Sequence, residues 1–387
     1  MSIPLRYNIG SLMSRRTSTF MSILGIGTVI GIMVSMVALY NGVRTAIVSS
    51  GSPENLMVLR EAALTEGTSW VTKEAYRIIR SLPGLEKQSN GDPVISPELV
   101  VIFKLPKKDD PKGSNVNVRG VTPAAFALRP YVRLVEGQMF RPGVNEVVVA
   151  NRVRNRFANL DIGDTFSFGP REWHVVGVFE ANGTSFDSEI WTDADFLGLA
   201  QKREAYSSLT LRPVDDVAFK SITDSIKSDN RLKLQVRSEY KYYADQTQGL
   251  LGIVILVAFV TVFMVIGATL GAMNTMFSAV AARKRELATM RALGFRRRAI
   301  LFSLVIEAGA ISFLGGVAGV LLALPVNGIS TGTTNFQTFS EVAFSFRVSP
   351  AVALFGVTLA VIAGIIGGTL PAITAARVPI TTALREV

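Results

Sequence analysis

The stretch QTQGLLGIVILVAFVTVFMVIGATLGAMNTMFSAVAA, residues 246–282, contains no charged side chain and is predominantly apolar. A helix needs about 20 mostly apolar residues to cross the hydrocarbon of a bilayer, so this stretch is longer than one crossing requires. Residues 17–43 and 348–376 are also uncharged, and residues 299–340 are interrupted only by Glu307. The sequence therefore predicts four membrane-spanning helices, and the second helix is expected to extend beyond the membrane.

We place the first span at about residues 20–42, the third at about 299–327 and the fourth at about 350–374. Each of the four spans contains two glycines one helical turn apart, which allows helix backbones to approach closely. We expect these pairs to support tight packing within one bundle, and a dimer contact at each pair is the alternative. The pairs are Gly27 and Gly31, Gly267 and Gly271, Gly315 and Gly319, and Gly364 and Gly368.

The distribution of charge predicts the orientation of the spans. Residues 44–245 contain 27 basic and 26 acidic residues, whereas the rest of the chain contains 13 basic and 4 acidic residues. Positive residues accumulate on the cytoplasmic side of a membrane. All three basic clusters fall on that side if both termini are cytoplasmic and residues 44–245 are extracytoplasmic. The clusters are Arg6, Arg15 and Arg16; Arg283, Lys284, Arg285, Arg291, Arg296, Arg297 and Arg298; and Arg377 and Arg385.

Composition removes several other interpretations. The chain has no cysteine, which excludes disulfides, thiol catalysis and cysteine metal sites. A pI near 9.9 can indicate nucleic-acid binding, but here the excess charge follows the membrane topology and the large soluble domain is nearly neutral. A cleaved signal peptide is the alternative for the first span. Its apolar run is longer than an ordinary signal core and no clear cleavage site follows, so we interpret it as an uncleaved anchor.

Residues 44–245 have the pattern of a mixed α+β domain, with an outer lobe near residues 119–205 and a membrane-proximal lobe built from the flanking segments. Residues 104–114 contain two prolines and six charged residues and predict an exposed loop. The expected strands are 55–60, 98–105, 115–121, 146–150, 172–180, 207–211 and 232–236. The expected helices are 72–81, capped by Thr72, then 193–202 and 215–227. The fold class is thus a four-span α-helical membrane protein with a large α+β domain inserted between spans one and two.

The residues that usually carry catalysis are sparse. No Gly-x-x-x-x-Gly-Lys-Ser/Thr sequence occurs, so the chain shows no phosphate-binding loop. His174 is the only histidine and lies within an alternating strand pattern, where a half-buried structural role is expected. Four clustered carboxylates resemble a solvated turn and not a catalytic pair: Asp187, Glu189, Asp193 and Asp195. The sequence indicates no catalytic, cofactor-binding or metal site.

The segment RKRELATMRALGFRRR, residues 283–298, joins spans two and three. As a helix it would place Leu287, Met290 and Leu293 along one side, and Gly294 suits a helix terminus. An amphipathic helix resting on anionic lipid headgroups is one interpretation. A short cytoplasmic helix that docks into a partner is the other, and the residues by themselves favour neither.

The segment ARKRELATMRALGFRRRAI, residues 282–300, resembles the coupling segment of the MacB/FtsX-like permeases of ABC transporters. Residues 371–387, PAITAARVPITTALREV, resemble the end of these permeases, including Pro379, Ala383, Leu384 and Arg385. Residues 44–245 resemble the MacB-type periplasmic core domain in GVTP (120–123), NEVVVA (145–150), IGD (162–164) and VVGVFE (175–180). The resemblance covers nearly the whole chain, with residues 246–387 corresponding to the FtsX-like domain.

The resemblance implies a permease in a bacterial cytoplasmic membrane that pairs with a second permease subunit, identical or not. A cytoplasmic ABC ATPase dimer would bind ATP and Mg²⁺, and its closure would move the extracytoplasmic domains; this chain is expected to hold no cofactor and to hydrolyse nothing. MacB itself carries a fused amino-terminal ATPase, so here the ATPase is expected on a separate polypeptide. Membrane lipid and a periplasmic adaptor are further expected partners, and nucleic acid is not. The expected coupling residues are Arg283, Lys284, Arg285, Glu286, Leu287, Met290, Arg291, Leu293 and Gly294.

Export or efflux from the periplasm is the function that the resemblance favours, and a lipoprotein-releasing or envelope-remodelling permease is the alternative within the family. A membrane-anchored ligand receptor is an alternative of another class, although residues 283–298 are too short for a signalling module. A secondary transporter would show polar or broken helices at the membrane midplane. Glu307, an acidic residue within a span, is expected near the basic loop and paired with one of its arginines.

Overall fold

The computed structural model describes residues 16–335 and 337–377, which form two compact units. One unit comprises residues 252–329 and 346–377 together with the helix preceding residue 42, and we call it the membrane unit. The other comprises residues 42–251 and 330–345, and we call it the outer domain. Several residues used above lie outside the described part of the chain: Arg6, Arg15, Pro379, Ala383, Leu384 and Arg385.

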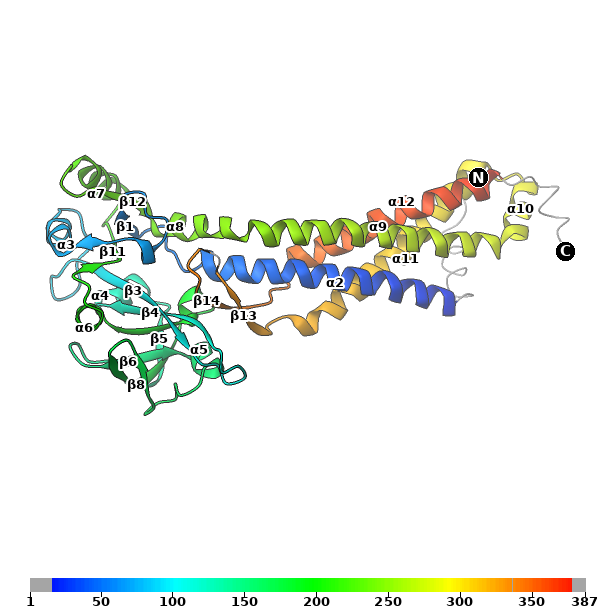
Figure 1. The fold of residues 1–387 in the computed structure, drawn as a ribbon. Helices are drawn as coiled ribbons and strands as arrows, with labels where there is room; N and C mark the ends of the chain where they lie inside the picture. Colours follow the sequence, from blue (N-terminus) through cyan, green and yellow to red (C-terminus); the bar gives the residue numbers. More distant parts are fainter. Residues whose placement is uncertain (1–15, 336, 378–387) are drawn as a thin grey trace. The chain divides into compact units, whose positions relative to one another are not determined.

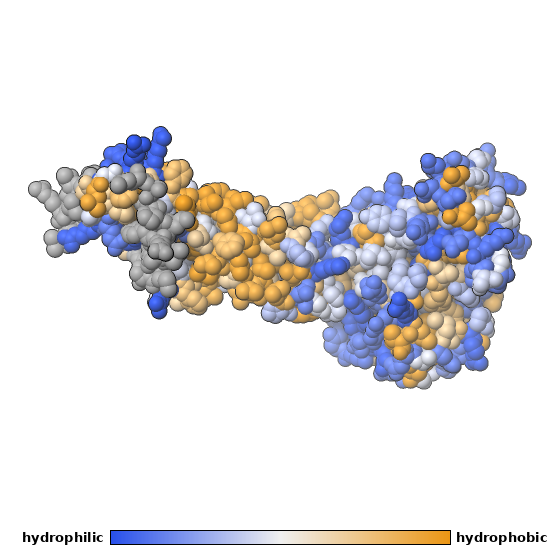
Figure 2. Space-filling model, turned by 180° about the vertical axis from the view of Figure 1, so that it is seen from behind, coloured by the Kyte–Doolittle hydropathy of each residue, from blue (hydrophilic) through white to orange (hydrophobic). Residues whose placement is uncertain are grey.

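Among the described residues, four helices are long and apolar enough to cross a membrane. They are α2 (Arg16–Val48), α9 (Leu251–Ala281), α11 (Arg297–Ala323) and α12 (Pro350–Arg377). Helix α9 continues the shorter elements α8 (Glu239–Gln246) and η3 (Thr247–Leu250), which gives a helical segment of 43 residues. At about 1.5 Å per residue this segment exceeds the roughly 30 Å of bilayer hydrocarbon. Four spans and a long second helix are therefore confirmed, and Figure 2 shows hydrophobic residues covering the membrane unit.

Glycines set the spacing between three of the four helices. A Cβ atom added at Gly319 on α11 would lie 2.7 Å from the carbonyl oxygen of Gly27 and 2.8 Å from Cβ of Ile30, both on α2. On α12, a Cβ at Gly364 would overlap Ser312, and one at Gly368 would overlap Ala308. Close packing is thus present at the glycine pairs of α2, α11 and α12. Figure 1 shows these helices as ribbons.

Helix α9 differs from the other three. No atom outside the helix backbone lies within 4 Å of a Cβ atom added at Gly267 or Gly271, so this pair makes no close helix contact within the described residues. Instead α9 meets α12 through Thr269 and Ala272, which approach Gly367. In its most apolar window 11% of α9 is buried, compared with 44% for α2.

The outer domain is built on a ten-stranded sheet. Its strands are β1 (Leu56–Arg60), β3 (Ile95–Leu105), β4 (Ser114–Val121), β5 (Arg133–Gly137), β6 (Glu146–Ala150), β7 (Thr165–Phe168), β8 (Arg171–Glu180), β9 (Glu189–Asp193), β11 (Ser208–Leu211) and β12 (Leu234–Ser238). The order is β12-β1-β11-β3-β4-β9-β6-β8-β5, and β7 also pairs with β8. The pairs β4–β9 and β6–β8 are parallel and the others antiparallel. The α+β class is therefore confirmed.

Short helices and a second small sheet complete this domain. The two-stranded sheet pairs β2 (Val71–Thr72) with β10 (Ala205–Tyr206). The helices are η1 (Glu66–Thr68), α3 (Lys73–Arg80), α4 (Ala124–Leu128), α5 (Asn151–Arg156), η2 (Ser185–Ser188), α6 (Ala194–Ala200) and α7 (Asp216–Ser228). Ile79 of α3 and Ile222 of α7 are buried in one cluster with Leu209 and Leu211 of β11, so these helices cover the sheet around β11.

The local predictions agree closely with these elements. All seven expected strands and all three expected helices are present, with boundaries shifted by at most three residues. The side chain of Thr72 accepts a hydrogen bond from the backbone nitrogen of Ala75, which confirms it as the cap of α3. The loop after Leu105 is largely exposed, as expected.

The connection between α11 and α12 forms a β-hairpin that was not expected from the sequence. Its strands are β13 (Ser330–Thr334) and β14 (Glu341–Ser345), and they follow a short turn, η4 (Leu324–Val326). The hairpin clusters with the outer domain, and Val342, Ala343 and Phe344 are buried there. A segment of the FtsX-like part of the chain therefore belongs structurally to the outer domain.

We predict that Gly319→Val lowers the thermal unfolding midpoint of the detergent-solubilised protein, because the new side chain forces α2 away from α11. Overpacking of this kind costs about 1–3 kcal/mol. The matched control is Gly25→Val on α2, which adds the same atoms where the described structure has open space. Equal midpoints for the two variants, measured by scanning calorimetry, would contradict the packing described above.

Candidate functional site

The segment between α9 and α11 folds as a short helix, α10 (Lys284–Ala292). Gly294, two residues after the helix, has a φ of 96° and turns the chain away from the helix axis. Its buried side is formed by Leu287 and Ala288, and Met290 packs against the same cluster of residues from α9, α11 and α12. The helix predicted for residues 283–298 is thus present, but Leu287 and Met290 stabilise the membrane unit itself. They are directed inward and do not form the outer face of the helix.

A buried ion pair holds the start of α10. The guanidinium of Arg283 donates through Nη1 to both carboxylate oxygens of Glu307 on α11, at 3.0 and 3.2 Å. Both side chains are buried, and Nε of Arg283 also approaches Glu286 at 3.4 Å. The expected pairing of Glu307 with an arginine of the basic segment is confirmed. Since α11 carries Glu307, the pair fixes α10 directly to the third span.

The exposed face of α10 contains the remaining predicted coupling residues. The Glu286 side chain is 62% exposed and Leu293 is 71% exposed, while Arg285 and Gly294 are also on the surface. Lys284 and Arg291 are half-buried. Leu293 is therefore an exposed apolar side chain close to the exposed charged residues Arg285 and Glu286.

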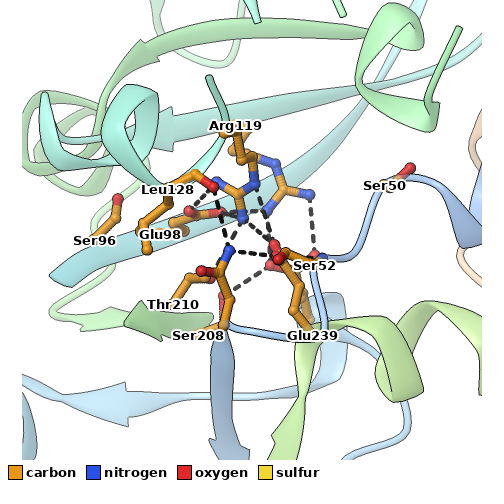
Figure 3. Close-up of polar contacts among 12 residues, drawn as sticks. Ser50, Ser52, Ser96, Glu98, Arg119, Leu128, Ser208, Thr210 and Glu239 are labelled. Carbon is orange, nitrogen blue, oxygen red and sulfur yellow. Dashed lines mark hydrogen bonds and ion pairs between the residues drawn. The ribbon is translucent and has the colours of Figure 1, made fainter. Parts of the chain in front are cut away.

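The outer domain contains a second group of buried charges, centred on Arg119 of β4 (Figure 3). All five N–H groups of Arg119 are used in hydrogen bonds to carboxylates. It binds Glu189 of β9 through Nε and Nη2 at 2.7 and 2.9 Å, and Glu66 of η1 through Nη1 and Nη2 at 2.7 and 3.0 Å. A further bond of 2.7 Å joins Nη1 to Glu98 of β3. One side chain therefore links three separate elements.

Arg129, which follows α4, extends this group of charges to the start of α8. It binds Glu98 at 2.5 Å and Glu239, the first residue of α8, at 2.8 Å. The other carboxylate oxygen of Glu239 accepts from the backbone nitrogen of Ser52 and the side chain of Asn55. We call these two arginines and four glutamates the polar core; it joins β3, β4 and β9 to the segments next to α2 and α8.

The polar core is almost completely shielded from solvent. Arg129, Glu98 and Glu239 have no exposed area, and Arg119 is 2% exposed. Burial by itself raises the pKa of the Glu98 carboxyl, but the guanidinium groups of Arg129 and Arg119 hold that pKa below its ordinary value. Breaking one partner of a buried pair leaves an uncompensated charge, so replacing any one of these residues alone is expected to destabilise the domain.

Two interpretations of the clustered carboxylates were wrong. Glu189 and Asp187 do not lie in a solvated turn: Glu189 belongs to the polar core, and Asp187 is buried and accepts from the backbone nitrogens of Ala181 and Gly183. Burial raises the pKa of Asp187, although these two bonds oppose the shift. Asp195 is exposed and Asp193 caps α6. The burial of Glu189 depends on its contact with Arg119, which is distant along the chain, whereas Asp187 is held by backbone amides of the preceding turn.

His174 was expected to be half-buried and is exposed on β8, where Nδ1 lies 2.9 Å from Oγ1 of Thr165. The neighbouring residues Trp173 and Val175 lie on the buried face of the strand. The predicted alternation is therefore correct, but His174 lies on the exposed face and not on the half-buried one that was expected. Within residues 16–335 and 337–377, no group of three or more His, Asp or Glu side chains is arranged to hold a metal ion.

The geometry defines a class of protein: four apolar helices with a short helix, α10, between the second and the third, and an α+β domain inserted after the first helix. Residues 19–229 match the model of the MacB-like periplasmic core domain, and residues 253–380 match that of the FtsX-like permease C-terminal region. The chain therefore belongs to the MacB/FtsX-like family of ABC transporter permeases, which form the permease component of these transporters. It is a multi-pass membrane protein with a large extracytoplasmic domain.

Curated relatives agree with this assignment. The chain is 26% identical to the macrolide export ATP-binding/permease protein MacB of Bordetella avium over 99% of its own length and 60% of the relative's. It is also 26% identical to the protein of the same description from Hahella chejuensis, over 97% of its own length and 59% of the relative's. The chain thus spans about 60% of the length of these relatives.

Two solved extracytoplasmic domains are also similar. The extracellular domain of the noncanonic ABC-type transporter YknZ from Gram-positive bacteria matches with a TM-score of 0.38 and 14% identity, over 47% of this chain and 99% of that one. The periplasmic region of MacB from Actinobacillus actinomycetemcomitans matches with a TM-score of 0.38 and 16% identity, over 53% of this chain and 95% of that one.

We predict that Glu307→Gln lowers the thermal unfolding midpoint and increases tryptic cleavage between α9 and α11, because the buried Arg283 loses its charged partner. Breaking a buried pair on one side costs about 3–5 kcal/mol. The double variant Glu307→Leu with Arg283→Met removes both charges and should recover much of the lost stability. An unchanged midpoint in the single variant would show that the pair does not hold α10.

The polar core predicts acid sensitivity of the outer domain. The pKa of Glu98 is lower in the folded state than its ordinary value of 4.5. The contribution of ionised Glu98 to the free energy of unfolding is therefore fully present above pH 4.5, and it is lost as the pH falls through the lowered pKa. The denaturant midpoint should therefore decrease below about pH 4.5. All three tryptophans, Trp70, Trp173 and Trp191, lie in this domain, so their fluorescence reports its unfolding specifically. Glu98→Gln should flatten the acid dependence, and an equally steep dependence would argue against this origin.

Proposed function

We propose that this chain is the permease subunit of an export or efflux ABC transporter, which couples ATP hydrolysis by a cytoplasmic ATPase to conformational change of its outer domain. Family membership supports the class of transporter. The observation that carries the coupling role is α10: it is fastened to the third span by the Arg283–Glu307 pair and exposes Glu286 and Leu293 on its other side. A force applied to this exposed face would reach α11 directly.

The proposal places the termini and α10 in the cytoplasm and the outer domain in the periplasm. The positive-inside rule supports this orientation, since the basic residues 283–298 would face the cytoplasm. The ATPase dimer would bind ATP and Mg²⁺, and the permease would hydrolyse nothing. The relatives are described as macrolide export proteins, and substrates of that kind are candidates for this chain.

We also propose that a second permease subunit completes the transporter. The low burial of α9 supports this, because Gly267 and Gly271 are open and the helix presents exposed Phe259, Phe263 and Ile266. Within a membrane, small residues allow another helix to approach closely, whereas lipid would cover the same surface in a monomer. A periplasmic adaptor on the outer domain is a further proposed partner, by analogy with the family.

We predict that Leu293→Glu and Glu286→Arg abolish co-purification of the ATPase with the tagged permease, because each change removes a contact from the exposed face of α10. Loss of a central docking residue costs about 2 kcal/mol or more, roughly a thirtyfold fall in affinity. The measurement is affinity purification in detergent with quantitative mass spectrometry of the recovered subunits.

Leu199→Glu is the matched control, since Leu199 is 73% exposed but belongs to α6 of the outer domain. It should leave ATPase recovery unchanged. Recovery of the ATPase with all three variants would place the docking surface elsewhere. Repeated recovery of the wild-type chain without any ATPase would favour the ligand-receptor alternative.

A further inference from the structure

The hairpin of β13 and β14 is bound to the outer domain by side chains from several elements. Glu341 receives two cations, Lys107 from the loop after β3 at 2.7 Å and Arg156 from the end of α5. The Glu341 side chain is 7% exposed, so both ion pairs are largely shielded from solvent. Asn115 of β4 also donates to the carbonyl oxygen of Phe339 at 2.9 Å. These contacts fix the hairpin much more firmly than a solvated loop would be fixed.

The small helix η2 binds both this hairpin and the end of the first span. Oγ of Ser188 accepts from the backbone nitrogen of Ala343 at 2.6 Å. At the other end of η2, the backbone nitrogen of Ser185 donates to Oγ of Ser50 at 2.9 Å, and the two hydroxyls lie 2.7 Å apart. Ser50 comes two residues after the end of α2. Four consecutive residues thus join the segment leaving span one to the connection between spans three and four.

The next residue brings in the second span. Glu189 follows η2 directly and binds Arg119, and the polar core continues through Glu98 and Arg129 to Glu239 at the start of α8. Helix α8 leads through η3 into α9. The segments that follow α2, precede α9 and join α11 to α12 therefore converge on η2 and the polar core, within one compact domain.

We propose that the β13–β14 hairpin is a coupling element, and that Glu341 is its positioning residue. Because the docked hairpin joins α11 to α12, the hairpin ends of these two helices would move together with the outer domain. Helix α10 would then be connected to the outer domain in two ways: through α9, which precedes it, and through α11, to which the Arg283–Glu307 pair binds it. The inference rests on the proposed coupling function. It adds a specific route, through the third and fourth spans, to that proposal.

The test uses the full chain with its ATPase in lipid nanodiscs, and two variants that release the hairpin by different means. Glu341→Gln removes the charge that binds Lys107 and Arg156. Gly332→Val leaves all charges in place, but its side chain would overlap the guanidinium of Arg156 and displace it from Glu341. Asp229→Asn is the matched control, because it removes an exposed ion pair with Arg231 elsewhere in the same domain.

Two measurements are made on each protein. The chain has no cysteine, so two introduced cysteines can be labelled specifically. In the first measurement, nitroxide spin labels are attached at Thr334→Cys on β13 and Asn155→Cys on α5, and the distance between the two labels reports whether the hairpin is docked. The second measurement is stimulation of the ATPase by the permease. We expect one narrow distance with and without a non-hydrolysable ATP analogue in the wild type and the control. In both release variants the distance should broaden and stimulation should fall roughly two- to thirtyfold, with tryptophan-detected unfolding remaining cooperative.

Full stimulation in variants whose spin-label distance has broadened would overturn the coupling role of the hairpin. An unchanged narrow distance in both variants would overturn the role of Glu341 in docking. A wild-type chain that neither binds nor stimulates an ATPase would instead remove the proposed function, and this inference with it. Rescue by Glu341→Asp, which keeps the charge, would support the ion pairs as the cause.

Discussion

A bilayer core supplies no water to backbone N–H and C=O groups, so each spanning segment must satisfy those groups internally as a helix. This constraint determines the four long helices and also where polar side chains can lie among them. Glu307 is accommodated because Arg283 reaches it from the adjoining segment. The pair at the same time anchors α10, so the requirement to neutralise one buried carboxylate positions the candidate coupling helix.

The outer domain meets a related requirement in a different setting. Its polar core buries two arginines and four glutamates, and each carboxylate is held by charge-assisted hydrogen bonds. Apolar residues could fill this space with less desolvation cost. The charged arrangement instead joins β3, β4 and β9 to the segments beside α2 and α8 through directional hydrogen bonds.

These contacts form two groups, one at each end of the proposed coupling route. At one end, α10 combines a buried attachment to α11 with an exposed face that carries Glu286 and Leu293. At the other, η2 and the polar core receive the segments that lead to every span. Neither end requires a catalytic residue in this chain, and both consist of attachments between elements that are far apart in the sequence.

The sequence by itself determined the features that depend on local composition: the spans from uncharged length, the strands and helices from periodicity, and the candidate coupling segment from its basic cluster and its family resemblance. It also predicted the pairing of Glu307, because only the nearby basic segment offered a partner. The tertiary structure decided the inward direction of Leu287, the burial of Glu189 and the docking of residues 330–345 on the outer domain. Each of these depends on a partner distant along the chain, such as Arg119 for Glu189 or Lys107 for Glu341, and local pattern contains no information about which distant charge will be near.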